Sequence, residues 1–188
     1  KDTDMPRYDV TFPFIRMMAG NVDFTPGALR NGTKENWVEC YQNLVSMGTR
    51  CHQLACYVIH DSPFTMLCDA PTNYEREQAC TDLITSIPDT FDETKILLGK
   101  IGCYIVTARR HGDDWYIGGQ TNWDERTVDL SLDCLSPGVS YQATIVTDGI
   151  NANHHAEDYH IEHKTLTASD TLSLKMASGG GFVVKVKR

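Results

Sequence analysis

The pattern of hydrophobic and polar positions divides the chain near residue 88. From Asp9 to about Ser86, continuous apolar runs alternate with stretches of helical periodicity. From Asp89 onward, short segments alternate between apolar and polar positions, with turn residues between them. Continuous runs are typical of parallel strands buried on both faces, and alternation is typical of antiparallel strands with one solvated face. The sequence therefore predicts an α/β part over residues 1–88 and an all-β part over residues 89–188.

In the first part we expect strands and helices in alternation, which implies parallel pairing with right-handed crossovers. Thr49 is a suitable N-cap for the first helix, because its hydroxyl can accept a hydrogen bond from a free backbone N–H. The predicted elements are a strand at 9–18, a long loop at 21–45, a helix from Thr49 through Tyr57, a strand at 63–68 and a helix from Thr72 or Asn73 to about Thr85.

In the second part, turn residues such as Ser136-Pro-Gly138 and Asp148-Gly149 separate short segments of strand character. Several short strands at this spacing predict an antiparallel β-sandwich of about 100 residues. The predicted strands are 95–98, 103–110, 114–120, 126–132, 140–147, 159–166, 171–176 and 181–187.

Two aspartates stand just after the two predicted strands of the first part. Asp23 follows the apolar run that starts at Phe12, and Asp69 follows the run that starts at Pro63. A buried strand that ends in a loop with a carboxylate is how a (β/α)8 barrel presents chemistry at its C-terminal face. Because two such units are too few to close a barrel, we interpret the chain as the tail of a longer protein.

Arg16 lies within the first of these apolar runs, where an unpaired charge would be costly. We expect it to pair with Asp23, with Asp69 or with a glutamate upstream of the chain, and the alternative is direct contact with a substrate. Each aspartate also has a structural interpretation, since Asp readily caps loops and helix N-termini.

Composition and charge narrow the class of protein. The net charge of −8 argues against a nucleic-acid-binding surface, which would show clustered Lys and Arg. The apolar stretches, such as Ile15–Gly20, are far shorter than a membrane span requires. The seven cysteines show no CxxC pair, which argues against a zinc site. We expect buried, reduced thiols, with one or two disulfides as the alternative.

Other candidate features have structural interpretations that we favour. His60-Asp61 suggests a dyad, but a turn that ends a helix before Pro63 explains the two residues, and we expect His52 to be half-buried or exposed scaffold. Gly179-Gly180-Gly181 lacks the lysine and the following helix of a phosphate-binding loop and is interpreted as a tight β turn. His154-His155 is a weak metal candidate, and Trp115, Tyr116 and Trp123 are expected to pack in the core or between domains rather than to stack on sugars.

The sequence resembles the C-terminal portion of glycoside hydrolase family 97, the bacterial α-glucosidase and α-galactosidase group. The matching segments are FPFIRMMAGNVDFTPGA (12–28), GTRCHQLACYVIHDSPFTMLCDAPTNYERE (48–77), IPDTFDET (87–94), GCYIVTARR (102–110), WYIGGQTNW (115–123), DGINA (148–152) and ASGGGFVVK (177–185). The Thr49–Leu54 and Leu67–Asp69 segments resemble the α-glucosidase branch more than the α-galactosidase branch.

The resemblance implies that residues 1–88 are the last two βα units of a (β/α)8 barrel and residues 89–188 a C-terminal β-sandwich. It implies hydrolysis of α-glucosidic bonds in maltooligosaccharides, with a retaining α-galactosidase or a non-catalytic carbohydrate-binding fragment as alternatives. The catalytic glutamates and the calcium ligands of the family belong to motifs upstream of Lys1. Asp23, Asp69 and Arg16 would then bind substrate, the partners would be the remaining barrel and an N-terminal domain, and the location would be periplasmic or secreted.

Overall fold

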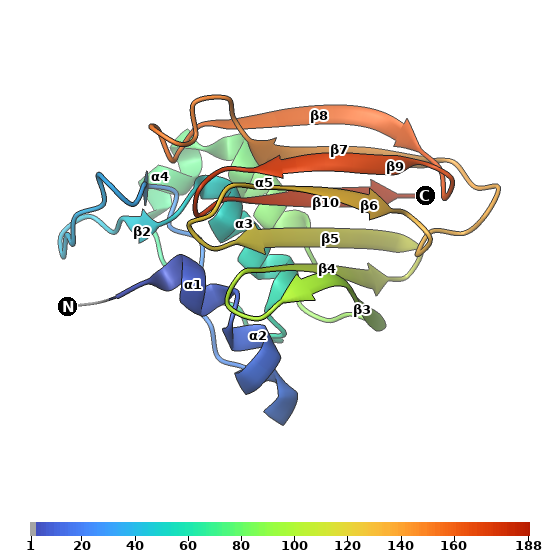
Figure 1. Ribbon diagram of the computed structural model, residues 1–188, viewed down its shortest axis with the longest axis horizontal. Coiled ribbons are helices and arrows are strands. Elements are labelled where there is room, and N and C mark those ends of the chain that lie inside the picture. The colour runs from blue at the N-terminus through green and yellow to red at the C-terminus, as the bar shows by residue number, and fades with distance from the viewer. Residues whose placement is uncertain (1–2) are drawn as a thin grey trace.

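The computed structural model describes residues 3–188 and contains a large antiparallel sheet covered on its two faces by different elements (Figure 1). The helical elements are α1 (Met5–Asp9), α2 (Phe12–Ile15), the 3-10 helix η1 (Arg16–Ala19), α3 (Arg50–Ile59), α4 (Pro71–Arg76) and α5 (Gln78–Ser86). The strands are β1 (Asn31–Gly32), β2 (Ser46–Met47), β3 (Glu93–Lys100), β4 (Tyr104–His111), β5 (Asp114–Thr121), β6 (Arg126–Ser131), β7 (Tyr141–Asp148), β8 (Tyr159–Leu166), β9 (Thr171–Met176) and β10 (Gly181–Lys187).

Residues 89–188 form two antiparallel sheets. The larger has the strand order β3-β4-β5-β10-β7-β8, and the smaller pairs β6 with β9. Side chains of both sheets share one core, in which Phe182, Leu130 and Met176 are fully buried. All eight predicted strands of this part are present, so the prediction of an antiparallel β unit is confirmed.

The last strand in the sequence, β10, lies at the centre of the large sheet between β5 and β7. Its pairing places Phe182 opposite Gly119 of β5 and Val184 opposite Ile145 of β7. Glycine at 119 leaves room for the Phe182 ring, which a Cβ at that position would overlap. Glycines in β5 therefore face the larger side chains of β10: Gly119 faces Phe182, and Gly118 faces Val183.

Helices cover the other face of the large sheet (Figure 1). α3 packs on β5 and β10, and its Leu54 and Val58 share a second core with Ile105 and Val183 of the sheet. As predicted, the Thr49 side chain caps α3 by accepting a hydrogen bond from the N–H of His52 at 3.1 Å. Because this core contains residues from both parts of the chain, the helices and the large sheet stabilise each other. The division of the chain into two domains at residue 88 stays a prediction.

The two strands expected at 9–18 and 63–68 are not present, and this part of the prediction is wrong. Residues 5–19 instead form α1, α2 and η1, with prolines in the first turns of α1 and α2, where their missing N–H costs nothing. Residues 63–68 contain no strand, although the N–H of Cys68 donates to the Pro26 carbonyl at 3.3 Å. A parallel strand needs neighbours to bind its backbone groups, whereas helical hydrogen bonds are local, so the apolar run alone does not decide between them.

The predicted helix at about 72–85 is present but broken. Glu77 leaves the helical conformation with φ −109° and ψ 52°, which separates α4 from α5. Its carboxylate lies 2.9 Å from Nη1 of the buried Arg50. No helix within residues 3–188 is long and apolar enough to cross a membrane.

Candidate functional site

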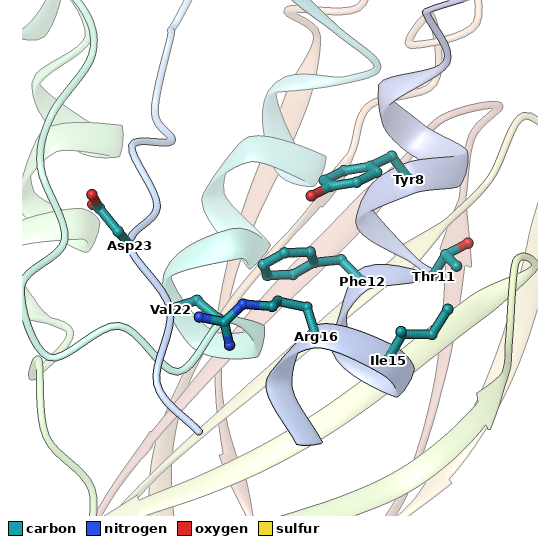
Figure 2. A pocket seen from close by; sticks show the side chains of 7 residues that line it. All are labelled: Tyr8, Thr11, Phe12, Ile15, Arg16, Val22 and Asp23. Atoms are coloured by element: carbon teal, nitrogen blue, oxygen red, sulfur yellow. The ribbon is translucent and has the colours of Figure 1, made fainter. Parts of the chain in front are cut away.

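Two of the three predicted site residues, Arg16 and Asp23, line one surface pocket (Figure 2). The pocket has a volume of about 430 Å³ and lies beside α1 and α2. Its wall is mostly apolar, and a guanidinium and a carboxylate are its charged groups. The lining residues are Tyr8, Thr11, Phe12, Ile15, Arg16, Val22 and Asp23.

Arg16 does not pair with either aspartate. Its Nη2 donates to the carbonyl of Asn21 at 3.4 Å, and the side chain is exposed. In Figure 2 the Asp23 carboxylate points away from the guanidinium. The expectation of a buried arginine paired with Asp23 or Asp69 is therefore wrong for the described residues, because Arg16 lies on an exposed helical turn rather than within a buried strand. Both charged groups remain open to a ligand, and the rings of Tyr8 and Phe12 lie 5.3 Å apart beside them.

Asp69 lies outside this pocket and binds the protein itself. One carboxylate oxygen accepts from the N–H of Leu29 at 2.8 Å, and the other accepts from the N–H of Ala70 at 2.8 Å and from the Asn73 amide at 2.6 Å. These are the contacts that the structural interpretation of Asp69 predicts. The carboxylate joins the start of α4 to residues 26–29, the segment that follows Asp23.

The segment from Pro26 to Leu29 is held by side chains of two helices. Tyr57 of α3 donates to the Pro26 carbonyl at 3.1 Å, and Tyr74 of α4 donates to the Gly27 carbonyl at 3.0 Å. Gly27 has φ +98°, and a Cβ there would overlap the Tyr57 hydroxyl, so only glycine fits. The loop that carries Asp23 is therefore anchored at its C-terminal end.

His52 and Asp9 form a buried pair that the sequence did not predict. His52 Nε2 lies 3.1 Å from Asp9 Oδ2, and both side chains are almost completely buried. The expectation that His52 is half-buried or exposed is therefore wrong, because α3 presents the residue to the sheet and to α1. Arg50 is also buried and binds Glu77 at 2.9 Å and Glu157 at 3.6 Å. No spacing in the sequence indicates these partners. Glu77 and Glu157 lie 27 and 107 residues after Arg50, and Asp9 lies 43 residues before His52.

Asp148 organises the turn between β9 and β10. Its Oδ2 accepts from the backbone N–H groups of Ala177 and Gly181 at 2.9 and 3.0 Å. Burial raises the pKa of Asp148 from 3.8 to about 6, although these hydrogen bonds favour the ionised form. The prediction that Gly179–Gly181 forms a tight turn is confirmed, with Gly179 at φ +63° and no room for a side chain at Gly180 beside Asp148.

His60 and Asp61 have separate surroundings, as the turn interpretation predicts. His60 is the C-cap residue of α3, and its ring contacts the Phe24 ring with centroids 4.0 Å apart. Burial lowers the pKa of His60 from 6.5 to about 4, so the ring is neutral at pH 7. Asp61 instead pairs with Arg109 at 3.2 Å. The two residues do not form a base with its orienting carboxylate.

The remaining candidates are structural. Trp115 and Tyr116 are buried, and Trp123 packs against Gly179, as the core-packing interpretation predicts. All seven cysteines are free, with Cys51, Cys56 and Cys80 buried and Cys40 exposed. Within residues 3–188, no group of three or more His, Cys, Asp or Glu side chains could hold a metal ion.

Comparison with known proteins places this geometry in a family. Residues 90–187 match the family model described as the glycosyl hydrolase 97 C-terminal, oligomerisation domain. A curated relative, a retaining α-galactosidase from Bacteroides thetaiotaomicron, is 49% identical over 185 residues, which cover 98% of this chain and 28% of that protein. A probable retaining α-galactosidase from Streptomyces bingchenggensis is 26% identical over 182 residues, which cover 97% of this chain and 26% of that protein.

Solved structures agree. A family 97 enzyme from Pseudoalteromonas sp. strain K8, in complex with acarbose, superposes with a TM-score of 0.86 at 35% identity, covering 97% of this chain and 28% of that one. A β-arabinopyranosidase shares the fold, with a TM-score of 0.77 at 22% identity. The chain belongs to glycoside hydrolase family 97 and spans about a quarter of the length of its curated relatives.

Proposed function

We propose that this chain is the C-terminal part of a glycoside hydrolase that cleaves α-galactosidic bonds with retention of configuration. The observation that carries the proposal is the 49% identity to a retaining α-galactosidase along 98% of the chain. The sequence alone favoured the α-glucosidase branch, and that assignment is the second candidate. It is supported by the 35% identity to an enzyme captured with acarbose.

In this proposal residues 1–88 complete a (β/α)8 barrel and residues 89–188 form a C-terminal β-sandwich that contributes to oligomerisation. Exposed apolar side chains on the first part support it: Ile15 is 61% exposed, Met18 83% and Phe64 76%. Such exposure is unusual when it recurs on neighbouring segments and is typical of a surface that another element covers. The occupant we propose is the rest of the barrel, which would cover these side chains in the complete enzyme.

Retention requires two carboxyl groups about 5–5.5 Å apart, one acting as nucleophile and the other as acid and base. We place both groups in the part of the protein upstream of this chain. Arg16 and Asp23 would contribute hydrogen bonds to sugar hydroxyls at the mouth of the barrel, since a guanidinium donates and a carboxylate accepts. Tyr57, Tyr74 and Asp69 would hold the loop that positions Asp23.

Calcium is proposed for the complete enzyme, with ligands outside this chain. The described residues do not fit a calcium site, because they contain no group of three or more carboxylate, imidazole or thiolate side chains close enough to bind one ion. We therefore assign calcium no role in what these residues do. A periplasmic or secreted location is likewise proposed from the family alone, and fractionation of the source cells would test it.

The test is hydrolysis by the complete protein that carries this chain. We expect release of p-nitrophenol from the α-galactoside at least tenfold faster than from the α-glucoside, with the α-anomer as first product by NMR. Faster cleavage of the α-glucoside would favour the second candidate. Absence of hydrolysis of both, in a folded protein, would overturn the proposal.

A further inference from the structure

We propose that β8 is the strand through which two copies of the chain associate, by antiparallel pairing about a two-fold axis at His163. The inference rests on the proposed oligomerisation role of residues 89–188 and assigns a surface and a register to it. It starts from the edges of the sheets, because an open edge presents unpaired N–H and C=O groups to a second strand.

β8 is an outer strand of the large sheet and pairs with β7 on one side (Figure 1). No described strand lies on its other side. Its register with β7 is regular from Tyr159 to Leu166, and the strand contains no proline. Residues 162–165 are all exposed, so side chains on both faces are open to solvent along this stretch. The edge of β8 is thus regular, is not paired with a described strand and is exposed at residues 162–165.

The opposite edge strand, β3, carries devices that oppose pairing. Its register with β4 is irregular between Ile96 and Leu98, as in a β-bulge, which twists the edge. α2 also approaches it, since a Cβ on Gly99 would lie 2.8 Å from the Phe14 ring. Of the two edges of the large sheet, β8 is therefore the better suited to strand addition.

Symmetry restricts the possible registers of β8 with its copy. Along an edge strand, every second residue points its backbone N–H and C=O toward the neighbouring strand. In an antiparallel pair such a residue always faces a residue of the same kind, so hydrogen-bonded and non-hydrogen-bonded pairs alternate. In a regular strand, a residue can therefore face only residues of the same number parity in the second copy. The two-fold axis must then pass through a residue position, with that residue facing its own copy.

Charge selects one position for the axis. With the axis at His163, Glu162 faces Lys164 of the second copy and Lys164 faces Glu162 of the second copy. With the axis at Glu162 or Lys164, that residue faces its own like charge, which is destabilising. Within one chain, Lys164 Nζ already lies 3.8 Å from Glu162 Oε1. Four alternating charges would therefore lie on the same face across the interface.

The other strands with an open edge do not offer this match. β9 contains one charged residue, Lys175, and β6 places Arg126 and Asp129 three positions apart, so parity forbids their pairing. In β3 the pair Glu93 and Lys95 would place the axis at Thr94, near the start of the strand, and Glu93 is already bound to Arg110 at 3.2 Å. β8 thus combines an open edge, a central axis position and complementary charges.

The experiment uses the complete enzyme and measures its mass in solution by light scattering coupled to size-exclusion chromatography. We expect Glu162→Lys and Lys164→Glu, each alone, to halve the mass at micromolar concentration. The double variant Glu162→Lys/Lys164→Glu should restore the parent mass, because the opposite charges again face each other. Restoration is a result that general loss of stability would not give.

A cysteine at the axis tests the register. Under mild oxidation His163→Cys should form a disulfide between two copies, because the two side chains face each other. Thr165→Cys is the matched control, since its two copies would lie roughly 13 Å apart. The parent protein accounts for any reaction of the native cysteines, including the exposed Cys40.

The outcomes separate the two proposals. An oligomeric parent whose mass is unchanged in both single variants, with no cross-link at residue 163, would overturn the β8 interface and leave the oligomerisation role standing. A monomeric parent would overturn both the interface and that role. Hydrolysis of the α-galactoside, assayed in the same samples, reports on the catalytic proposal independently of either result.

Discussion

His52 Nε2 lies 3.1 Å from Asp9 Oδ2, and this buried contact joins α3 to α1. The other ring nitrogen, Nδ1, lies 3.2 Å from the carbonyl oxygen of Gly180, in the turn between β9 and β10. A single imidazole therefore connects the N-terminal helices, the central helix and the end of the large sheet. The pocket that contains Arg16 and Asp23 is built on α1 and α2, so its position depends on this contact.

We expect Asp9→Ala to lower the free energy of unfolding by about 1–3 kcal/mol, as is typical when a buried polar group loses its hydrogen-bond partner. The substitution leaves His52 Nε2 buried without its partner. Urea denaturation of the complete enzyme, followed by tryptophan fluorescence, measures the change. Asp133→Ala, at an exposed position, is the matched control and should change stability by less than about 0.5 kcal/mol. Equal effects of the two substitutions would contradict the structural role of the His52–Asp9 contact.

A second prediction concerns the packing of β10 on β5. Gly119 faces Phe182 across the two strands, and a Cβ at 119 would overlap the ring. We expect Gly119→Ala to cost about 1–3 kcal/mol, because a well-packed core does not absorb an added methyl group. In the double variant with Phe182→Leu, part of this cost should disappear, since the smaller side chain vacates the space. A double-mutant cycle on unfolding free energies measures the coupling, and additive effects would show that the two residues do not compete for space.

The pH dependence of stability follows from His60. Its pKa falls from 6.5 in the unfolded chain to about 4 in the folded protein because the ring is buried. The folded state therefore binds this proton less readily than the unfolded state does. The contribution of His60 is fully present above pH 6.5 and is lost as the pH falls toward 4, by about 3 kcal/mol in total.

Asp148 acts in the opposite direction over nearly the same range, so the parent protein alone would hide the effect. Its raised pKa makes the folded state favour the protonated carboxyl, and its contribution falls as the pH rises from 3.8 to about 6. We therefore expect the difference in unfolding free energy between the parent and His60→Phe to change with pH in this window. A pH-independent difference would mean that His60 is not a buried neutral ring. The same comparison for Asp148→Asn should show the reverse slope.

The sequence predicted the antiparallel part of the fold well because strict alternation leaves little choice. In β6, Val128 and Leu130 point into the core and their neighbours point out, as the sequence pattern of this strand indicates. Thr49 likewise identified the start of α3 from its capping chemistry. Periodicity and capping are local signals, so they can be interpreted without knowledge of partners.

Prediction failed where structure depends on distant partners. The apolar pattern at 9–18 predicts a strand, but this segment contains Pro13 at a helix start, and no described strand pairs with it. The His52–Asp9 contact joins residues 43 positions apart. The prediction that Arg16 is buried depended on the prediction of a buried strand at 9–18. Because that strand is a set of short helices instead, the predicted environment of Arg16 is also wrong.

The last prediction separates the two candidate aspartates. Asp69 accepts hydrogen bonds from Leu29, Ala70 and Asn73, so Asp69→Ala should lower the free energy of unfolding by about 1–3 kcal/mol as well as impair hydrolysis. Asp23 is exposed on the pocket wall, so Asp23→Ala should leave the unfolding free energy within about 0.5 kcal/mol of the parent value. If it binds a sugar hydroxyl, kcat/KM should fall at least tenfold, about 1.4 kcal/mol of transition-state stabilisation.

Kinetics and urea denaturation of the complete enzyme, measured on the same preparations, make the comparison. Asp23→Asn is the matched variant, because the amide keeps one acceptor oxygen and the shape of the side chain, and it should retain part of the lost activity. A reduced kcat/KM with unchanged stability would identify Asp23 as a binding residue. If Asp23→Ala retains full kcat/KM, the pocket beside α1 and α2 does not contact the substrate. In that case Asp69, which holds the same loop, can affect hydrolysis through stability alone.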